Sequence, residues 1–172
     1  MFDLTTGYQV TEKFYIGVNA ALGSQKGEYQ GSANLGSSGK DTTKRWGGGA
    51  LYMNYAFTGM FGLGLRVEGF DNTSGIRGLK RNGAAPASVN GGTSGTDVMS
   101  ITLTGNLTLA DGHLLLKPEF RLDNFKKLDY TPVSGLTQAG IDAGNHQQFM
   151  DKNGNMTKNS QATIGLAAIY KF

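Results

Sequence analysis

The sequence contains no cysteine and only three prolines, and charged residues make up 17% of it. Without a thiol, the chain can form no zinc–thiolate site, no iron–sulfur cluster and no cysteine nucleophile. The charged fraction lies below the roughly 25% that is usual in soluble domains. No apolar run approaches the roughly 18 residues of a transmembrane helix. These shortages exclude thiol chemistry and helical membrane spans.

The chain is also only weakly basic. The formal net charge is +3, and the Lys and Arg residues are scattered along the chain. Because no basic run of the kind that binds nucleic acid is present, we predict no nucleic-acid partner. Residues 1–10 lack the charged and apolar regions of a signal peptide. For a secreted protein, this start predicts a mature or truncated chain.

Glycine, in contrast, is abundant, with 27 residues, which is about twice its usual share. Glycine is costly inside helices, and helical periodicity is scarce in this chain. Instead, apolar and polar residues alternate with a period of two in segments that recur at regular intervals. The sequence therefore predicts an all-β protein.

Seven segments show this alternation. The expected strands cover residues 2–10, 14–22, 51–57, 61–68, 99–109, 114–123 and 163–172. Most approach the roughly 9–11 residues that a tilted transmembrane strand needs, whereas strands of soluble proteins more often have about 5–6. Strict alternation places Trp46 on the polar side of the third segment, which predicts a bulge or a loop there.

The connections alternate between short and long. The short ones are 11–13, 58–60 and 110–112, and in the last of these Asp111-Gly112 is a signal for a two-residue hairpin. The long ones, 25–44, 74–95 and 127–158, are rich in Gly, Ser, Asn, Asp and Thr. Short turns on one side and long loops on the other are typical of an antiparallel transmembrane β-barrel, whose short turns face the periplasm.

Two features favour this barrel over a soluble β-sandwich binding module. First, aromatic side chains gather near the short-turn ends of the strands: Tyr8, Phe14, Tyr55, Phe57, Phe61, Tyr170 and Phe172. Such amphipathic rings prefer a membrane interface. Second, the polar faces carry long charged side chains in mid-strand, where a hydrated lumen would lie. These residues are Arg66, Glu68, Lys117, Glu119 and Arg121.

The last strand resembles the C-terminal β-signal of bacterial outer-membrane proteins, which the barrel-assembly machinery reads. The signal places a terminal aromatic residue after apolar residues at alternate positions. The matching residues are Ile164, Leu166, Ala168, Tyr170 and Phe172. The glycine that is often preferred six positions from the end is displaced here. An ordinary amphipathic last strand is the alternative interpretation.

Three further segments resemble the OmpL-like β-barrel porin family. They are 46–55 (WGGGALYMNY), 65–71 (LRVEGFD) with Gly75 after it, and 117–123 (KPEFRLD). The resemblance covers about residues 44–172. It implies an outer-membrane porin of a Gram-negative-type bacterium, with membrane lipid around it and passive diffusion of small hydrophilic solutes or ions through it. The lumen-lining residues would be Arg66, Glu68, Lys117, Glu119, Arg121 and Asp123.

The number of strands poses a problem of closure. If the last of seven strands descends to the periplasm, the first descends too, and the two could pair only in parallel. Single-chain bacterial barrels have even strand numbers, and an open edge in lipid leaves backbone groups unsatisfied. We therefore expect residues 1–172 to form a single, N-terminally incomplete barrel domain. Missing upstream strands, another polypeptide, a homo-oligomer or a parallel closing seam would complete it.

The charged residues of the fourth and sixth segments are the candidate site. Because strands two apart in a sheet lie about 9.5 Å from each other, Arg66 or Glu68 could meet Lys117, Glu119 or Arg121. Such a set forms either a charged constriction that selects solutes or a structural ion-pair network. We favour the network, because opposite charges close together largely cancel a selecting field. The alternative function is a non-conducting structural or adhesive barrel with ligand-binding outer loops.

Nothing in the sequence predicts an enzyme, a metal site or a cofactor. Gly62 and Gly64 are spaced like part of a nucleotide loop, but no helix follows them. Residues 151–155 resemble a calcium loop without its closing glutamate, and we interpret them as a turn. His113 and His146 are interpreted as solvated, and no serine has a credible His and Asp partner.

Overall fold

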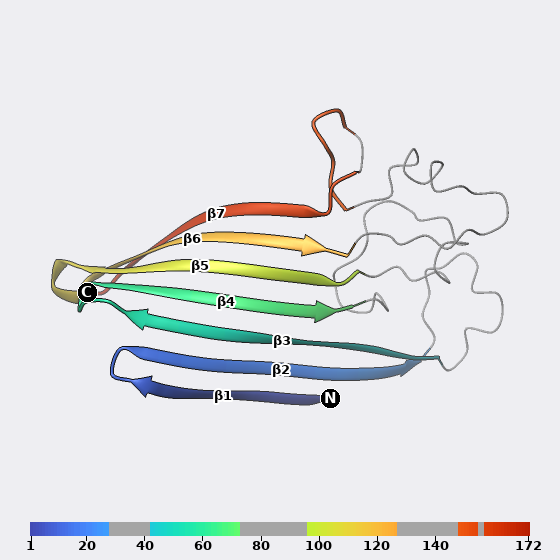
Figure 1. Ribbon diagram of the computed structural model, residues 1–172, viewed down its shortest axis with the longest axis horizontal. Coiled ribbons are helices and arrows are strands. Elements are labelled where there is room, and N and C mark those ends of the chain that lie inside the picture. The colour runs from blue at the N-terminus through green and yellow to red at the C-terminus, as the bar shows by residue number, and fades with distance from the viewer. Residues whose placement is uncertain (28–41, 73–95, 127–147, 155–156) are drawn as a thin grey trace.

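A computed structural model describes residues 1–27, 42–72, 96–126, 148–154 and 157–172. These residues form one antiparallel sheet of seven strands (Figure 1). The strands are β1 (Phe2–Thr11), β2 (Phe14–Gly27), β3 (Thr42–Ala56), β4 (Phe61–Asp71), β5 (Val98–Leu109), β6 (Leu114–Phe125) and β7 (Ser160–Tyr170). The all-β prediction and the position of each predicted strand are confirmed. In the described part of the chain, no helix is long and apolar enough to cross a membrane.

The strands follow one another in chain order, from β1 at one edge to β7 at the other. The connections β1–β2, β3–β4 and β5–β6 lie at one end of the sheet, which we call the short-turn end, together with the C-terminus (Figure 1). The opposite end is the long-connection end. Each neighbouring pair is antiparallel, so β1 and β7 run in the same direction. The described strands do not close on themselves, and β1 and β7 are the two edges.

Two predictions about β2 and β3 are wrong. Strands β2 and β3 pair as far as Gly27 and Thr42, so the first long connection is shorter than the predicted 25–44. The β2–β3 register is also continuous, without the bulge or loop expected at Trp46. Residues 74–95 lie outside the described residues. Within the third predicted loop, Phe149 and Lys158 form an isolated antiparallel bridge.

The short turns are closed by local hydrogen bonds. The hydroxyl oxygen of Thr11 accepts bonds from the backbone N–H groups of Lys13 and Phe14, at 3.3 and 3.1 Å. Thr58 does the same for Met60 and Phe61, at 3.2 and 3.0 Å. In both turns, a threonine hydroxyl therefore accepts hydrogen bonds from backbone N–H groups that have no partner in the neighbouring strand.

The third turn is longer than predicted. Leu109 pairs with Leu114, which leaves four residues in the connection rather than the three of the predicted 110–112. Asp111 and Gly112 have positive φ values of 52° and 92°, as the hairpin signal requires. Ala110 also has a positive φ, of 50°, a backbone region that alanine disfavours. The additional residue is His113, which follows the three positive-φ residues.

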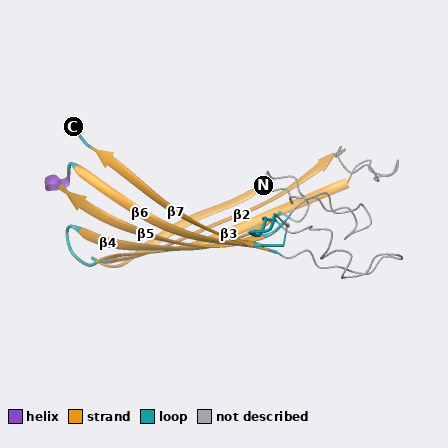
Figure 2. Cartoon of the chain, turned by 90° about the horizontal axis from the view of Figure 1, so that it is seen from above, coloured by secondary structure: helices purple, strands orange, loops and turns teal. Residues whose placement is uncertain are grey.

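The sheet has two chemically distinct faces, and seen from above it is strongly twisted (Figure 2). One row on the apolar face crosses all seven strands: Thr6, Val18, Leu51, Val67, Ile101, Leu122 and Ala162. The adjacent row on the polar face is Gly7, Gly17, Tyr52, Arg66, Thr102, Arg121 and Thr163. Register therefore keeps the two faces separate across every strand pair.

Burial shows which way the sheet curves. Along β5, Ser100 and Thr102 are 1% and 5% exposed, whereas Ile101 and Leu103 are 42% and 41% exposed. The polar side chains therefore crowd together inside the curve, and the apolar ones point outward. This is the reverse of a water-soluble domain, in which the crowded side would be apolar.

Candidate functional site

Arg121 is the centre of an ion-pair network on the polar face. Its Nη2 lies 2.8 Å from Oε1 of Glu68, and its Nε donates to Oδ1 of Asp123 at 2.8 Å. Its Nη2 also donates to the hydroxyl of Ser100 at 3.1 Å, and that hydroxyl donates to Asp123. Arg66 pairs with Glu68. We call these five residues, Arg66, Glu68, Ser100, Arg121 and Asp123, the arginine network.

Strand order places these residues together. Arg66 and Arg121 are both paired in register with Thr102 of β5, and Glu68 and Asp123 are both paired with Ser100. Because β5 contributes only small side chains here, the long side chains of β4 and β6 meet above it. The predicted contact between these two strands is confirmed, through Glu68 and Arg121. Ser100 was not predicted as a member, because a serine in an alternating strand has no distinguishing pattern.

The network combines two guanidinium groups with two carboxylates. The side chains of Arg66, Glu68, Arg121 and Asp123 are 39%, 17%, 31% and 15% exposed. At this partial burial, each charge depends on its partners to offset lost hydration. The Arg66 guanidinium also lies 5.4 Å from the centroid of the Tyr52 ring, a cation–π geometry. The ion pairs fix the positions of these side chains. Because two positive and two negative charges lie close together, the network adds little net electric field to the polar face.

Lys117 and Glu119 lie on the same face but outside the arginine network. Glu119 accepts a hydrogen bond from Thr104 at 3.1 Å. Lys117 makes no ion pair with any residue that the structure describes. Both line a hollow of about 540 Å³ that also includes Tyr52, Asn106 and Arg121. Both charged side chains therefore border space that a solute can enter.

Three aromatic side chains of the polar face lie over glycines of the preceding strand. Tyr15 covers Gly7, Trp46 covers Gly23, and Phe70 covers Gly48. A Cβ atom at any of these glycines would collide with the aromatic ring. Glycine on one strand thus provides room for a ring from the next, a device that pins sheet register. Sequence reasoning missed these pairs, because each depends on the register between two strands.

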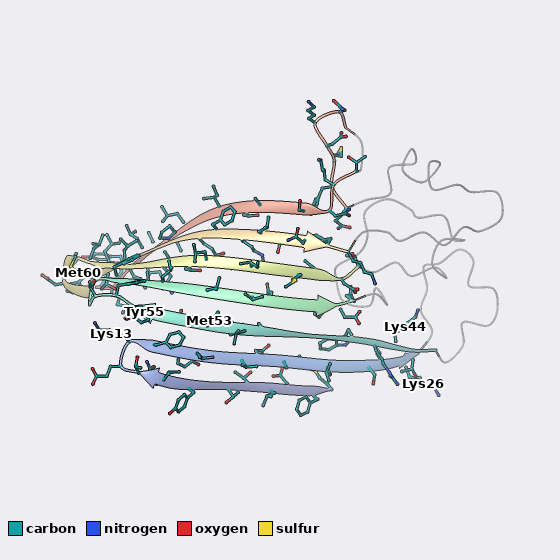
Figure 3. All side chains as sticks on the ribbon, viewed as in Figure 1. Lys13, Lys26, Lys44, Met53, Tyr55 and Met60 are labelled. Atoms are coloured by element: carbon teal, nitrogen blue, oxygen red, sulfur yellow. The ribbon has the colours of Figure 1, made fainter. Side chains whose placement is uncertain are left out.

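Four of the seven aromatic residues predicted at the short-turn end form a connected cluster: Phe14, Tyr55, Phe57 and Phe61. Ring centroids are separated by 6.3 Å for Phe14–Tyr55, 4.8 Å for Tyr55–Phe57 and 5.5 Å for Phe57–Phe61. Tyr55 lies at this end near Lys13 and Met60, whereas Lys26 and Lys44 lie at the opposite end (Figure 3). The cluster matches the aromatic girdle of a membrane interface.

Charge on the apolar face is confined to the long-connection end. Within the seven strands, the charged residues on this face are Lys26, Arg45 and Asp71. All three lie near the ends of their strands, beyond the apolar rows in the middle of the face. Because a charge in mid-bilayer is costly, this distribution leaves the middle of the face suited to lipid.

The C-terminal residues align on the same apolar face. Ile164 and Leu166 are 84% and 71% exposed, and Tyr170 packs on Phe172 at 5.3 Å. The His113 side chain, predicted to be simply solvated, is exposed but its Nδ1–H donates to the carbonyl oxygen of Lys171 at 3.0 Å. The turn before β6 therefore holds the end of β7.

The other candidate motifs supply no chemistry. Asp151 accepts hydrogen bonds from the backbone N–H of Asn153 at 2.8 Å and from Thr157 at 3.1 Å, so the predicted turn is formed. His146 lies outside the described residues. Gly62 and Gly64 lie within β4, as predicted. In the part of the chain that the structure describes, no group of His, Asp or Glu is arranged to hold a metal ion.

A single sheet of long antiparallel strands, apolar outside and polar inside, with aromatic residues at one rim, defines the class of transmembrane β-barrel proteins. This chain belongs to the β-barrel porin family described as "Putative beta-barrel porin-2, OmpL-like", whose sequence profile matches residues 1–172. The predicted family is thereby confirmed, over the whole chain rather than from about residue 44. No curated protein and no solved structure matches the chain.

Proposed function

We propose that the chain forms the wall of an outer-membrane pore through which small hydrophilic solutes or ions diffuse passively. The polar face supports this most directly, because long charged side chains lie in mid-strand, where a hydrated lumen would stabilise them. Membership of a β-barrel porin family supports a porin role. The residues lining the lumen would be Arg66, Glu68, Lys117, Glu119, Arg121 and Asp123. We infer a non-enzymatic protein, since a porin needs no catalytic group.

Conductance tests this function. Protein extracted from outer membranes in detergent is added to a planar lipid bilayer, and stepwise current increases are expected. Lys117→Glu should then shift the reversal potential toward cation selectivity, because it adds negative charge at an unpaired lumen position. Lys152→Glu, in the turn beyond the strands, is the matched control and should leave the potential unchanged. Absence of current steps would contradict the pore.

Closure of the barrel is part of the proposal. Strands β1 and β7 run in the same direction, so an antiparallel closure requires an odd number of additional strands between them. Upstream strands of a longer chain or strands of another polypeptide would supply this number. A homo-oligomer would instead join β1 to β7 of another copy in parallel. Either arrangement satisfies the edge N–H and C=O groups, which lipid cannot do.

The mass of the native complex separates these arrangements. Protein captured from detergent extracts with an antibody to residues 127–158 is weighed by native mass spectrometry. A single polypeptide far heavier than 18.3 kDa indicates additional strands in the same chain. A complex of several 18.3 kDa chains indicates a homo-oligomer. A lone 18.3 kDa species would indicate a parallel seam within seven strands and would contradict additional strands.

A non-conducting structural or adhesive barrel is the second candidate. A closed barrel of about eight strands is filled by its own side chains, and the arginine network already occupies the middle of the polar face. This candidate predicts correct membrane insertion without conductance. The same bilayer recordings therefore decide between the two functions.

We further propose that the barrel-assembly machinery recognises the last strand. Its residues Ile164, Leu166, Ala168, Tyr170 and Phe172 present a continuous apolar row. Deleting Phe172 should strongly reduce the amount of heat-modifiable protein in outer membranes, whereas His113→Ala, which only loosens the same strand end, should not. Equal assembly of both variants would contradict recognition of the terminal aromatic residue.

A further inference from the structure

Two aromatic rings interrupt the polar face near the long-connection end. Trp46 of β3 and Phe70 of β4 lie with their ring centroids 6.2 Å apart and their planes tilted by 48°. Phe70 lies against the position that a Cβ of Gly48 would occupy, at 2.9 Å. The two rings thus form an aromatic ledge, Trp46 and Phe70, on the face that carries the arginine network.

A hollow of about 320 Å³ adjoins this ledge. Its apolar lining includes Phe70, Val98 and Ala50. Asn19, Arg66, Glu68 and Arg121 line it with hydrogen-bonding groups. Its size falls at the lower end of the range for small-molecule sites. An apolar wall opposite a few convergent polar groups is the usual composition of such a site.

The charges around the hollow favour no sign of solute charge. Within the seven strands, the charged residues of the polar face are the basic Lys44, Arg66, Lys117 and Arg121 and the acidic Asp3, Glu68, Glu119 and Asp123. The four charges of the arginine network are paired with one another. A neutral solute that offers many hydroxyl groups can share hydrogen bonds with these fixed groups without breaking an ion pair.

We propose that the hollow beside the aromatic ledge binds one ring of a neutral carbohydrate. The apolar face of a pyranose carries C–H groups made slightly positive by the neighbouring oxygens, and the face of an aromatic ring is negative. The sugar ring stacks on Phe70, and its hydroxyl groups meet Glu68, Arg121 and Asn19. This inference rests on the proposed pore, through which the solute would reach the hollow. It adds that the solute is a neutral carbohydrate.

Binding can be measured without conduction, because Trp46 is the single tryptophan of the sequence. Detergent-solubilised protein is titrated with glucose, galactose and lactose while the Trp46 emission is recorded. Each sugar is expected to cause a saturable change. Sorbitol, which has the same hydroxyl chemistry but no ring face, should cause none at equal concentration. Glucuronate and glucosamine should bind no better than glucose, since the face is charge-balanced.

Phe70→Leu removes the ring but keeps an apolar side chain. It should raise the half-saturating concentration of glucose about tenfold, the loss expected for one aromatic stack. Phe61→Leu is the matched control, because Phe61 lies on the same strand but on the apolar face. Both variants are first checked for heat-modifiable migration, so that only folded protein is compared.

The outcomes separate this inference from the pore. Current steps without any sugar-dependent emission change would overturn the carbohydrate site and leave the porin proposal standing. An equal response to sorbitol, or an unchanged affinity in Phe70→Leu, would overturn stacking on the ledge. A sugar response without current steps would support the site and contradict the pore.

Discussion

Ile101 and Thr102 are neighbours in the chain, yet they belong to two faces with opposite requirements. Ile101 is 42% exposed on the apolar face, and Thr102 is 5% exposed on the polar face. On the polar face, side chains contact one another through ion pairs and hydrogen bonds. On the apolar face, the mid-strand aliphatic side chains point away from the sheet. The polar face is therefore stabilised from within the protein, and the apolar face depends on lipid.

The largest expected effect comes from placing charge on the apolar face. Leu103→Arg should destabilise the folded protein by about 2–4 kcal/mol, the cost measured for arginine near the bilayer midplane. Thr104→Arg, one residue along and beside Glu119, should cost less than about 1 kcal/mol, because the polar face is hydrated. Urea titrations of refolding into lipid vesicles measure both. If both substitutions destabilised the protein equally, the two faces would have to lie in the same solvent, which would contradict the proposed lipid-facing side.

The arginine network offers the next test. Arg121→Leu leaves Glu68 and Asp123 without their shared partner, and it should destabilise by about 1–3 kcal/mol at this partial burial. Lys117→Leu, on the same strand and face but unpaired, should change stability by less than about 0.5 kcal/mol. The same vesicle-refolding titration compares them. A small effect of Arg121→Leu would reduce the network to solvated surface charges.

The glycine beneath Trp46 should give a smaller effect. Gly23→Ala forces the indole ring to move, and overpacking of this kind costs about 1–3 kcal/mol, with the lower end expected at an accessible face. Gly165→Ala is the control, because a Cβ there meets nothing within 4 Å. A blue or red shift of the Trp46 emission in Gly23→Ala alone would report the displaced ring. Identical spectra would contradict the contact.

The smallest expected effect is a gain. Ala110→Gly should stabilise the protein by about 0.5–1 kcal/mol, because Ala110 has a φ of 50°, which glycine adopts without strain. Gly112→Ala, at a φ of 92°, should destabilise by a similar amount or more. Both residues lie in the β5–β6 turn, so neither substitution alters a side chain of the polar or the apolar face. Vesicle refolding in urea provides the measurement, and a loss of stability in Ala110→Gly would contradict the backbone argument.

The parts that sequence predicted are those that follow from local alternation. Period-two patterning located all seven strands and assigned Arg66, Glu68 and Arg121 to one face. It also placed Tyr55, Phe57 and Phe61 at one rim, because the turns that define this rim are short and recognisable. The length of an alternating segment is enough to distinguish such strands from those of a typical soluble sandwich.

The parts that sequence missed depend on which residues face each other across strands. Ser100 joins Asp123, and Trp46 lies over Gly23, only because of a register fixed in three dimensions. The sequence around a glycine or a serine does not indicate which residue it will contact on the next strand. The bulge expected at Trp46 was wrong for the same reason, since an indole on the polar face looked misplaced until the glycine opposite it was known.

The strand order has a consequence for how the sheet forms. Each of the six pairings in the described sheet joins two strands that are consecutive in the sequence. Three of the six pairings close through turns of a few residues, which makes those hairpins the natural units of assembly. Joining the hairpins requires the long connections to close, and that entropic cost grows only slowly with loop length. The long connections can thus change in length and sequence at little cost to the folding of the sheet.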